Sequence, residues 1–456
     1  MSIISDSDTE FFLGKSLNAS IQLLPSNPQN PPRIRYLIIL LAYVLCLGSY
    51  FIYDNPAALQ TQLQHTLGID SIKYNLFYSV YSFPNIIIPI LGGYLVDRIG
   101  NRNCNIVFTL LILLGQALFT FSVIIDNYPM ALAGRCLFGI GGESLNISQY
   151  NVIIGWAHAK EVSFVLGLAA TLNRLSTAAN DNAIPIIQEK TSLGFSLCIG
   201  VILCGISFMS AIILAWLDKN KSRFILENKK IEDEKFRIKD VREFGTSFWL
   251  LSFNACFLYC AIYCFNNVGS NYFQERFGYS TVESGHILSI TFIVCVVLCP
   301  INGYILDKYG YRIYHIILSS FLATLSHVLF FATPSSKKPL APIFYMFLLG
   351  LSFSLASAVI WSSISSVIKK GSGTAYGIIL SLFNAGLVVF PPSIGALKDH
   401  TNRDHGYYWV SFELIILGML AIVTSVLLYV FNKREGGSLC HGTNRISIEL
   451  KEITKC

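Results

Sequence analysis

Two ionisable side chains within long apolar segments are the residues of this sequence best placed to do chemistry. Glu143 lies in the segment 128–155 and Arg174 in the segment 161–185. A charge at bilayer depth costs at least about 2.5 kcal/mol on insertion scales, so it usually marks a functional site. A carboxylate suits an ammonium group, and a guanidinium fork binds a carboxylate through two hydrogen bonds. This pair of residue types would hold the two ends of a zwitterion.

The two charges are expected at the same depth in the membrane. The chain length from Glu143 to Trp156 equals that from Glu161 to Arg174. At the helical rise of ~1.5 Å per residue, each charge lies ~20 Å from the cytosolic end of its segment. Two interpretations remain open. The residues form an ion pair that joins two adjacent helices, or they line a cavity that binds a substrate, and both hold if the pair closes when the site is empty.

Further polar residues inside apolar segments are weaker candidates for contact with a substrate. Packing between helices is the alternative for Trp361 and Asn384, which belong to the second half of the chain. An aromatic belt at the membrane interface is the alternative for Tyr50. Asp54 is either a gate residue near the lumenal mouth or a helix cap before Pro56. The candidate substrate-binding residues are Glu143, Arg174, Trp361, Asn384, Tyr50 and Asn173.

A ladder of glycines accompanies Glu143 in its segment. Glycine removes side-chain bulk and lets a neighbouring helix approach closely. Arg135, in the same segment, is expected to be architectural, with hydrogen bonds to the backbone or to a neighbouring helix. The glycines of this ladder are Gly134, Gly139, Gly141 and Gly142.

The composition predicts that membrane-spanning helices position these residues. Of the 456 residues, 53% are hydrophobic and only 13% are charged, and the mean hydropathy is +0.55. A span needs roughly 20 apolar residues, so the chain is long enough for about twelve. The predicted helical spans are 34–53, 73–96, 105–125, 128–155, 161–185, 194–217, 246–268, 282–306, 313–333, 342–367, 372–396 and 406–431.

The spans divide the chain into two halves. Lys and Arg gather at alternate span ends, which places both termini and the central connector in the cytosol. The predicted class is an all-α membrane protein of two six-helix pseudo-repeats. The predicted regions are a disordered cytosolic tail (1–32), an N-terminal six-helix bundle (33–217), a cytosolic connector (218–244), a C-terminal six-helix bundle (245–431) and a cytosolic tail (432–456).

Several classes of function are not indicated. Most of the cysteines lie in apolar runs, and no Cys/His spacing indicates a metal site, so no cofactor is expected. No nucleophile–base constellation indicates an enzyme. Basic residues cluster at span ends, which indicates contact with membrane lipid and gives no reason to expect nucleic acid.

A ten-residue motif occurs twice, once after the second span of each half. The stretch Gly93 to Arg102 is echoed by Gly303 to Arg312. In the first copy, Gly100 is expected to permit a tight turn, and the carboxylate at position 97 engages a helix end or basic residues. Two copies in register indicate a duplicated transporter. The motif residues expected to gate or brace the bundles are Gly93, Asp97, Arg98, Gly100, Arg102, Asp307, Lys308 and Arg312, together with Arg135 and Asp54.

These motifs resemble those of the major facilitator superfamily. The loop Gly93-x-x-x-Asp-Arg-x-Gly-x-Arg is similar to its signature loop, and Arg135-x-x-x-Gly139 resembles its second motif. Three further stretches resemble its lysosomal dipeptide transporter branch, namely 50–60, 138–145 and 373–377.

The resemblance implies a fold and an activity. The fold would be two six-helix bundles that rock about a midplane site. The activity would be uniport of dipeptides, including cationic Lys-, Arg- or His-containing ones, from lumen to cytosol. Glu143 would bind the amino end of the peptide and Arg174 its carboxyl end. The alternatives are a facilitator for an amino acid, a sugar or an organic anion, and a non-transporting receptor on the same fold.

The resemblance also implies a lysosomal membrane location and a partner. The N-terminal tail has no acidic dileucine signal at the usual spacing, so the plasma membrane or another endomembrane is the alternative location. No N-glycan is expected at the sequons of Asn18, Asn146 and Asn220. A bare protein in a protease-rich lumen would need shielding, and the family implies a heavily glycosylated single-span lysosomal membrane protein as that subunit.

Overall fold

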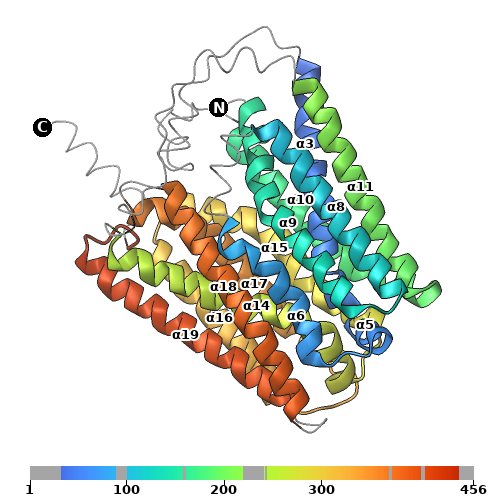
Figure 1. The fold of residues 1–456 in the computed structure, drawn as a ribbon. Helices are drawn as coiled ribbons and strands as arrows, with labels where there is room; N and C mark the ends of the chain where they lie inside the picture. Colours follow the sequence, from blue (N-terminus) through green and yellow to red (C-terminus); the bar gives the residue numbers. More distant parts are fainter. Residues whose placement is uncertain are drawn as a thin grey trace, which may run out of the picture. The chain divides into compact units, whose positions relative to one another are not determined.

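The computed structural model describes residues 32–88, 100–157, 161–218, 241, 244–368, 372–401 and 406–440. In these ranges the long elements are all helices, which confirms the predicted all-α class. The chain divides into two compact units, Met1–Phe236 and Arg237–Cys456 (Figure 1). This division falls inside the predicted connector 218–244, most of which lies outside the described residues, as do nearly all of the tail 1–32 and residues 441–456. The finer domain boundaries stay a prediction.

Each unit has its own set of helices. The N-terminal unit contains α3 (Pro32–Tyr53), α4 (Asn55–Ala58), α5 (Gln60–Leu67), α6 (Ser71–Ser82), η1 (Pro84–Ile86), α8 (Asn101–Ile124), α9 (Tyr128–Trp156), α10 (Val162–Lys190) and α11 (Leu193–Asp218). The C-terminal unit contains α14 (Thr246–Phe277), α15 (Thr281–Tyr309), α16 (Arg312–Ala332), α17 (Ala341–Val367), α18 (Ser372–His400) and α19 (Gly406–Arg434).

Nine of the described helices are long and apolar enough to cross a membrane: α3, α8, α11 and α14 to α19. The two helices that carry the candidate charges are also long, with 29 residues each. They are more polar, since α9 contains Arg135 and Glu143 and α10 contains Arg174 and Asp181. The protein is therefore a multi-pass membrane protein, and the count of twelve spans stays a prediction.

The internal repeat extends from the sequence to the packing. In the N-terminal unit α8 packs against α9 and α11, while α3 packs against α10 and α11. In the C-terminal unit α16 packs against α17 and α19, and α14 packs against α18 and α19. The pairs correspond helix for helix along the chain, as expected for two copies of one six-helix design.

Both copies of the repeated motif place a glycine with positive φ before the next helix. Gly100 has φ +84° directly before α8, and Gly310 has φ +72° directly before Tyr311 and α16. A positive φ is accessible to glycine at low cost, so the predicted turn at Gly100 is confirmed. The motif residues Gly93, Asp97 and Arg98 lie outside the described residues.

In the second copy, the motif joins neighbouring helices. Arg312 Nη1 donates to the carbonyl oxygen of Ser362 on α17 over 2.7 Å, and the charge of Arg312 acts on Asp307. Lys308 is exposed, with its ammonium 5.2 Å from the centroid of the Tyr309 ring. In the first copy, Arg102 is half-buried at the start of α8.

The predicted span 73–96 is not one continuous helix. Helix α6 ends at Ser82, and a short 3₁₀ turn covers Pro84 to Ile86. Proline has no backbone N–H to donate and clashes with the carbonyl one turn earlier, so the helix breaks there. Asn85 Nδ2 satisfies the freed carbonyl of Tyr81 over 3.1 Å and also donates to the Gly139 carbonyl over 3.0 Å.

Several further boundaries differ from those expected, and the fifth span, predicted to end at residue 185, continues through Pro185 to Lys190. The stretch after Tyr53 was predicted to be a lumenal loop, but it folds into α4 and α5, and all of α4 is buried. Pro56 at the start of α4 presets a helical φ, which explains a helix in a polar stretch. The seventh span, predicted to end at residue 268, continues to Phe277, and the polar residues Ser270 and Asn271 in this extension are buried.

The glycine ladder of α9 sets how closely its neighbours approach. A Cβ at Gly134 would lie 2.7 Å from Phe119 N on α8, and one at Gly139 would lie 2.2 Å from the carbonyl oxygen of Tyr81. Both distances are too short for any side chain, so the backbones touch only because these positions have none.

We expect Gly139→Ala to lower the thermal unfolding midpoint of the purified protein, because the added methyl group must displace backbone. Overpacking of this kind costs about 1–3 kcal/mol. Gly155→Ala on the same helix is the matched control, since a Cβ there meets nothing within 4 Å, and alanine favours a helix over glycine. Equal midpoints for the two variants would contradict the close approach at Gly139.

Candidate functional site

Glu143 and Arg174 lie on adjacent helices of the N-terminal unit. Helix α9 ends at Trp156 and α10 begins after Glu161, which are the two ends assumed when equal depth was predicted. Both side chains are half-buried. The positive charge of Arg174 acts on the Glu143 carboxylate. The structure therefore brings the two predicted charges into one electrostatic neighbourhood.

Tyr81 on α6 completes the surroundings of Glu143. Its hydroxyl donates a hydrogen bond to the Glu143 carboxylate, and a Cβ at Gly142 would lie 2.6 Å from this hydroxyl. Gly142 thus leaves the space that the tyrosine occupies. The ring packs against Phe138 with centroids 4.7 Å apart. Tyr81 was not among the predicted site residues; its helical spacing from Tyr78 is visible in the sequence, but such spacing is more typical of packing.

Tyr50 brings a third helix, α3, to the two charges. The centre of the Arg174 guanidinium lies 5.5 Å from the centroid of the Tyr50 ring. This is within the range of a cation–π contact. The charges of both Arg174 and Glu143 act on the Tyr50 hydroxyl. Tyr50 therefore lies beside the two charges.

Hydrogen bonds between α3 and α10 fix the height of Arg174 against Tyr50. Thr177 Oγ1 donates to the carbonyl oxygen of Tyr50 over 3.2 Å, and Ser176 Oγ donates to that of Leu47 over 2.8 Å. Because both donors lie within one helical turn after Arg174, the guanidinium is held in register with α3.

Asn173 joins α10 to α9 within the unit. It is 1% exposed, and its Nδ2 donates to Gln149 Oε1 over 3.2 Å. Gln149 Nε2 in turn donates to the carbonyl oxygen of Ala42 on α3 over 2.9 Å. The amide of this candidate substrate-binding residue is thus used to connect three helices.

Arg135 is bound by backbone and aromatic groups. Its guanidinium donates to the carbonyl oxygens of Phe77, Ile52 and Tyr53 over 3.3–3.4 Å. The surrounding rings are those of Tyr53, Tyr78, Tyr81 and Phe138, with centroids 5.2–5.8 Å from the guanidinium. These are the contacts of an architectural residue that ties α9 to α3 and α6.

Asp54 occupies the N-cap position of α4, but its side chain makes no capping hydrogen bond. It is 3% exposed, and the charges of Arg135 and Arg174 act on it. The carboxylate therefore belongs to the interior charge cluster of this unit, a position that the cap interpretation did not anticipate.

The candidates of the C-terminal unit lie among aromatic rings. Trp361 stacks on Tyr376 with centroids 6.1 Å apart and on Tyr259 with centroids 6.3 Å apart. Asn384 is fully buried on α18; its Nδ2 donates to the carbonyl oxygen of Leu380, while its Oδ1 has no hydrogen-bond partner among the described residues. This unit thus contributes an aromatic stack and an amide.

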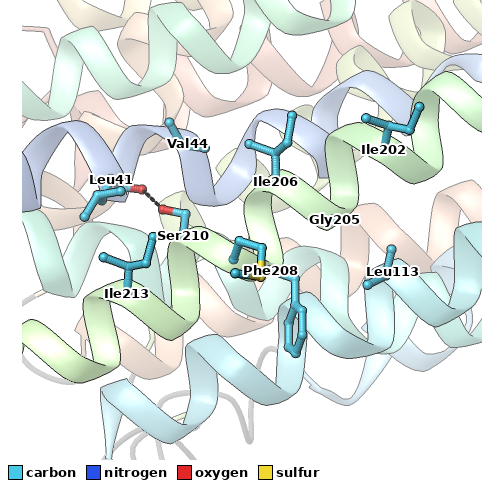
Figure 2. Close-up of a pocket in the computed structure, with 10 residues that line it drawn as sticks. Leu41, Val44, Leu113, Ile202, Gly205, Ile206, Phe208, Ser210 and Ile213 are labelled. Carbon is cyan, nitrogen blue, oxygen red and sulfur yellow. Dashed lines mark hydrogen bonds between the residues drawn. The ribbon is translucent and has the colours of Figure 1, made fainter.

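An apolar groove on the surface of α3, α8 and α11 is a different kind of feature. Figure 2 shows its aliphatic lining and the hydrogen bond from Ser210 Oγ to the carbonyl oxygen of Leu41, 2.7 Å long. Ile202 and Met209 are more than half exposed there. No ionisable side chain lines the groove, so it does not suit a zwitterion. Its lining residues are Leu41, Val44, Leu113, Ile202, Gly205, Ile206, Phe208, Met209, Ser210 and Ile213.

Comparison with known proteins gives the family. The model of the Major Facilitator Superfamily matches residues 39–391. The human (Homo sapiens) protein named lysosomal dipeptide transporter MFSD1 is 32% identical over 424 residues, which cover 90% of this chain and 89% of that protein. The protein of the same name from Danio rerio is 32% identical over 431 residues, with 92% of both chains covered.

A solved structure gives the fold independently. The crystal structure of the peptide transporter POT in complex with sulfate matches with a TM-score of 0.69 over 96% of this chain and 100% of that one. At 12% identity this likeness concerns the fold alone. The chain therefore belongs to the major facilitator superfamily and, within it, to the MFSD1 family.

Proposed function

We propose that this protein is a dipeptide transporter of the lysosomal membrane. Relatives that match about nine-tenths of the chain carry that name, and the relatives and structural matches are transporters rather than enzymes. The observation that carries the proposal is that Glu143 and Arg174 lie on adjacent helices and interact electrostatically.

The chemistry of the site suits the two ends of a dipeptide. The Glu143 carboxylate receives the ammonium group, and the Arg174 guanidinium receives the carboxylate as a bidentate fork. The charge of Arg174 acts on the Glu143 carboxylate, and a zwitterion would add two charge-assisted hydrogen bonds, one to each residue. A solute with one charged end leaves Glu143 or Arg174 without a charged partner, and a neutral solute leaves both without one, which is costly where water is excluded.

The rest of the proposal follows from the family and the repeat. The two units rock about the site and export the dipeptide from lumen to cytosol, with both termini in the cytosol. Dipeptides with Lys, Arg or His side chains are included. Asn146, the one sequon asparagine within the described residues, lies inside α9. This position supports a lumenal surface without N-glycans. A glycosylated single-span partner subunit would then protect it.

Transport into liposomes that contain the purified protein tests the proposed clasp, by which we mean the binding of the two ends of a dipeptide by Glu143 and Arg174. We expect Glu143→Gln and Arg174→Lys each to weaken dipeptide binding and uptake by about tenfold to hundredfold, because each removes one charge-assisted or bidentate bond of about 1.5–3 kcal/mol. Glu189→Gln, at the exposed end of the same α10 helix, is the matched control and should behave as wild type.

Two results would contradict this assignment. Normal dipeptide uptake by Glu143→Gln would favour another solute, such as a sugar or an organic anion. Failure of every dipeptide to stabilise the folded wild-type protein against heat, together with no uptake, would favour the non-transporting receptor.

Tyr81→Phe tests how Glu143 is positioned. We expect it to lower affinity for a free dipeptide several-fold, because the hydroxyl that orients the carboxylate is lost. Affinity for an N-acetylated dipeptide, which lacks the ammonium group, should differ little from that of wild type. Tyr74→Phe, which removes a hydroxyl 3.3 Å from that of Tyr78, is the control. An equal loss for both ligands would mean that Tyr81 acts on the fold alone.

A pH-sensitive dye inside the same liposomes tests uniport. The ends of a zwitterion satisfy both charges of the clasp, so no proton needs to travel with the substrate. We expect dipeptide entry without a change in internal pH when a non-titrating peptide is used. Proton flux driven by the dipeptide would replace uniport by proton-coupled transport.

A further inference from the structure

Two buried aspartates lie where α4 packs against α10. Asp54 is 3% exposed at the turn between α3 and α4, and Asp181 on α10 is fully buried. Asn180 Nδ2 donates to Asp181 Oδ1 over 3.3 Å, whereas Asp181 Oδ2 has no hydrogen-bond partner among the described residues. The negative charge of Asp54 acts on Asp181. A buried carboxylate oxygen without a donor, near a second carboxylate, is a costly arrangement.

The charges around these aspartates do not balance. Arg135 and Arg174 act on Asp54, and Arg174 is shared with Glu143. Three carboxylates therefore face two guanidiniums, which leaves one negative charge in excess when all five groups are ionised. One bound proton removes this excess. The other titratable groups that face the cluster are Cys46, Tyr50 and Tyr53 on α3, Tyr78 and Tyr81 on α6, and Tyr150 on α9.

We propose that Asp54 and Asp181 form a proton-binding site, in which one proton is shared between the two carboxyl groups of the folded protein. It supplies the donor that Asp181 Oδ2 lacks and lets Arg135 and Arg174 be neutralised by Asp54 and Glu143. Burial raises the pKa of the Asp54 carboxyl, while the two arginines act in the opposite direction.

Polar groups around the site fit this role. Asn55, directly after Asp54, is fully buried, and neither atom of its amide has a hydrogen-bond partner among the described residues. Gln60, at the start of α5, is also fully buried, and neither atom of its amide has a hydrogen-bond partner among the described residues. Water molecules that bridge such amides are a usual component of buried polar sites, and at Asn55 they would give a proton a path to the Asp54 carboxyl group.

The shared proton makes the packing of α4 against α10 depend on pH. When the proton leaves, two like charges face each other in a buried contact, and α4 is driven away from α10. The unfolded chain binds no proton at these aspartates above about pH 5, whereas the folded chain does. The folded state therefore loses stability as the pH rises. The proton remains on the protein through a transport cycle, so this site regulates packing and is compatible with uniport.

The test compares thermal unfolding of the full-length protein at about pH 5 and about pH 7.5. We expect the wild-type midpoint to fall by about 5 °C or more over this range. In Asp181→Asn the cluster is neutral without a proton, so this fall should be largely lost. Glu189→Gln, which changes an exposed acid on the same helix, should keep the wild-type fall. An equal fall in Asp181→Asn and wild type would overturn the proposal.

Infrared spectroscopy of the wild-type protein gives a second measurement that needs no variant to fold. A protonated buried carboxyl group has a carbonyl band that disappears when it ionises. We expect such a band at about pH 5 and its loss towards alkaline pH. Its absence from the wild type, or its persistence in folded Asp181→Asn, would overturn the site. Neither measurement uses a substrate, so failure here leaves the proposed transport function untouched.

Discussion

An ionised side chain among apolar helices must be neutralised by its neighbours, and this constraint organises the N-terminal unit. Arg135 draws three backbone carbonyls and four aromatic rings around itself. Glu143 has the Tyr81 hydroxyl and the charge of Arg174. Except for the Phe138 ring, which lies on the same helix as Arg135, these contacts cross from one helix to another, so satisfying the charges also fixes how α3, α6, α9 and α10 are assembled.

Backbone shape makes this neutralisation possible. The carbonyl and hydroxyl groups of Tyr81 reach α9 only because Gly139 and Gly142 have no side chain. The break at Pro84 turns the chain away after Tyr81, and Asn85 compensates for it with two bonds to backbone carbonyls. Close helix contact and buried polarity therefore depend on each other here. The glycines allow the polar groups of neighbouring helices to come within hydrogen-bond distance, and these hydrogen bonds offset the apolar side-chain contacts that a glycine cannot make.

The sequence predicted the features that depend on length and on residue type. The end of α9 at Trp156 and the start of α10 after Glu161 follow from apolar length, and the equal depth of Glu143 and Arg174 stays a prediction that rests on those two ends. The break after Ser82 was missed because apolar composition does not distinguish a continuous helix from an interrupted one. Tyr81 was missed because an aromatic residue at helical spacing usually indicates packing, and its hydroxyl partner is on another helix. The role of Asp54 depends on charges from α9 and α10, which no local pattern encodes.

The two units share a packing scheme but not a chemistry, and this difference bears on transport. Helix α17, the counterpart of α9, contains no ionisable Asp, Glu, Lys or Arg, and Trp361 in it stacks between two tyrosines. Both members of the proposed clasp, Glu143 and Arg174, belong to the N-terminal unit. A motion of one unit against the other therefore leaves the distance between them unchanged. Under the proposed function, the ends of a dipeptide would therefore stay bound to Glu143 and Arg174 while access to the site changes, and the energy of those two bonds would not be lost and regained during the motion.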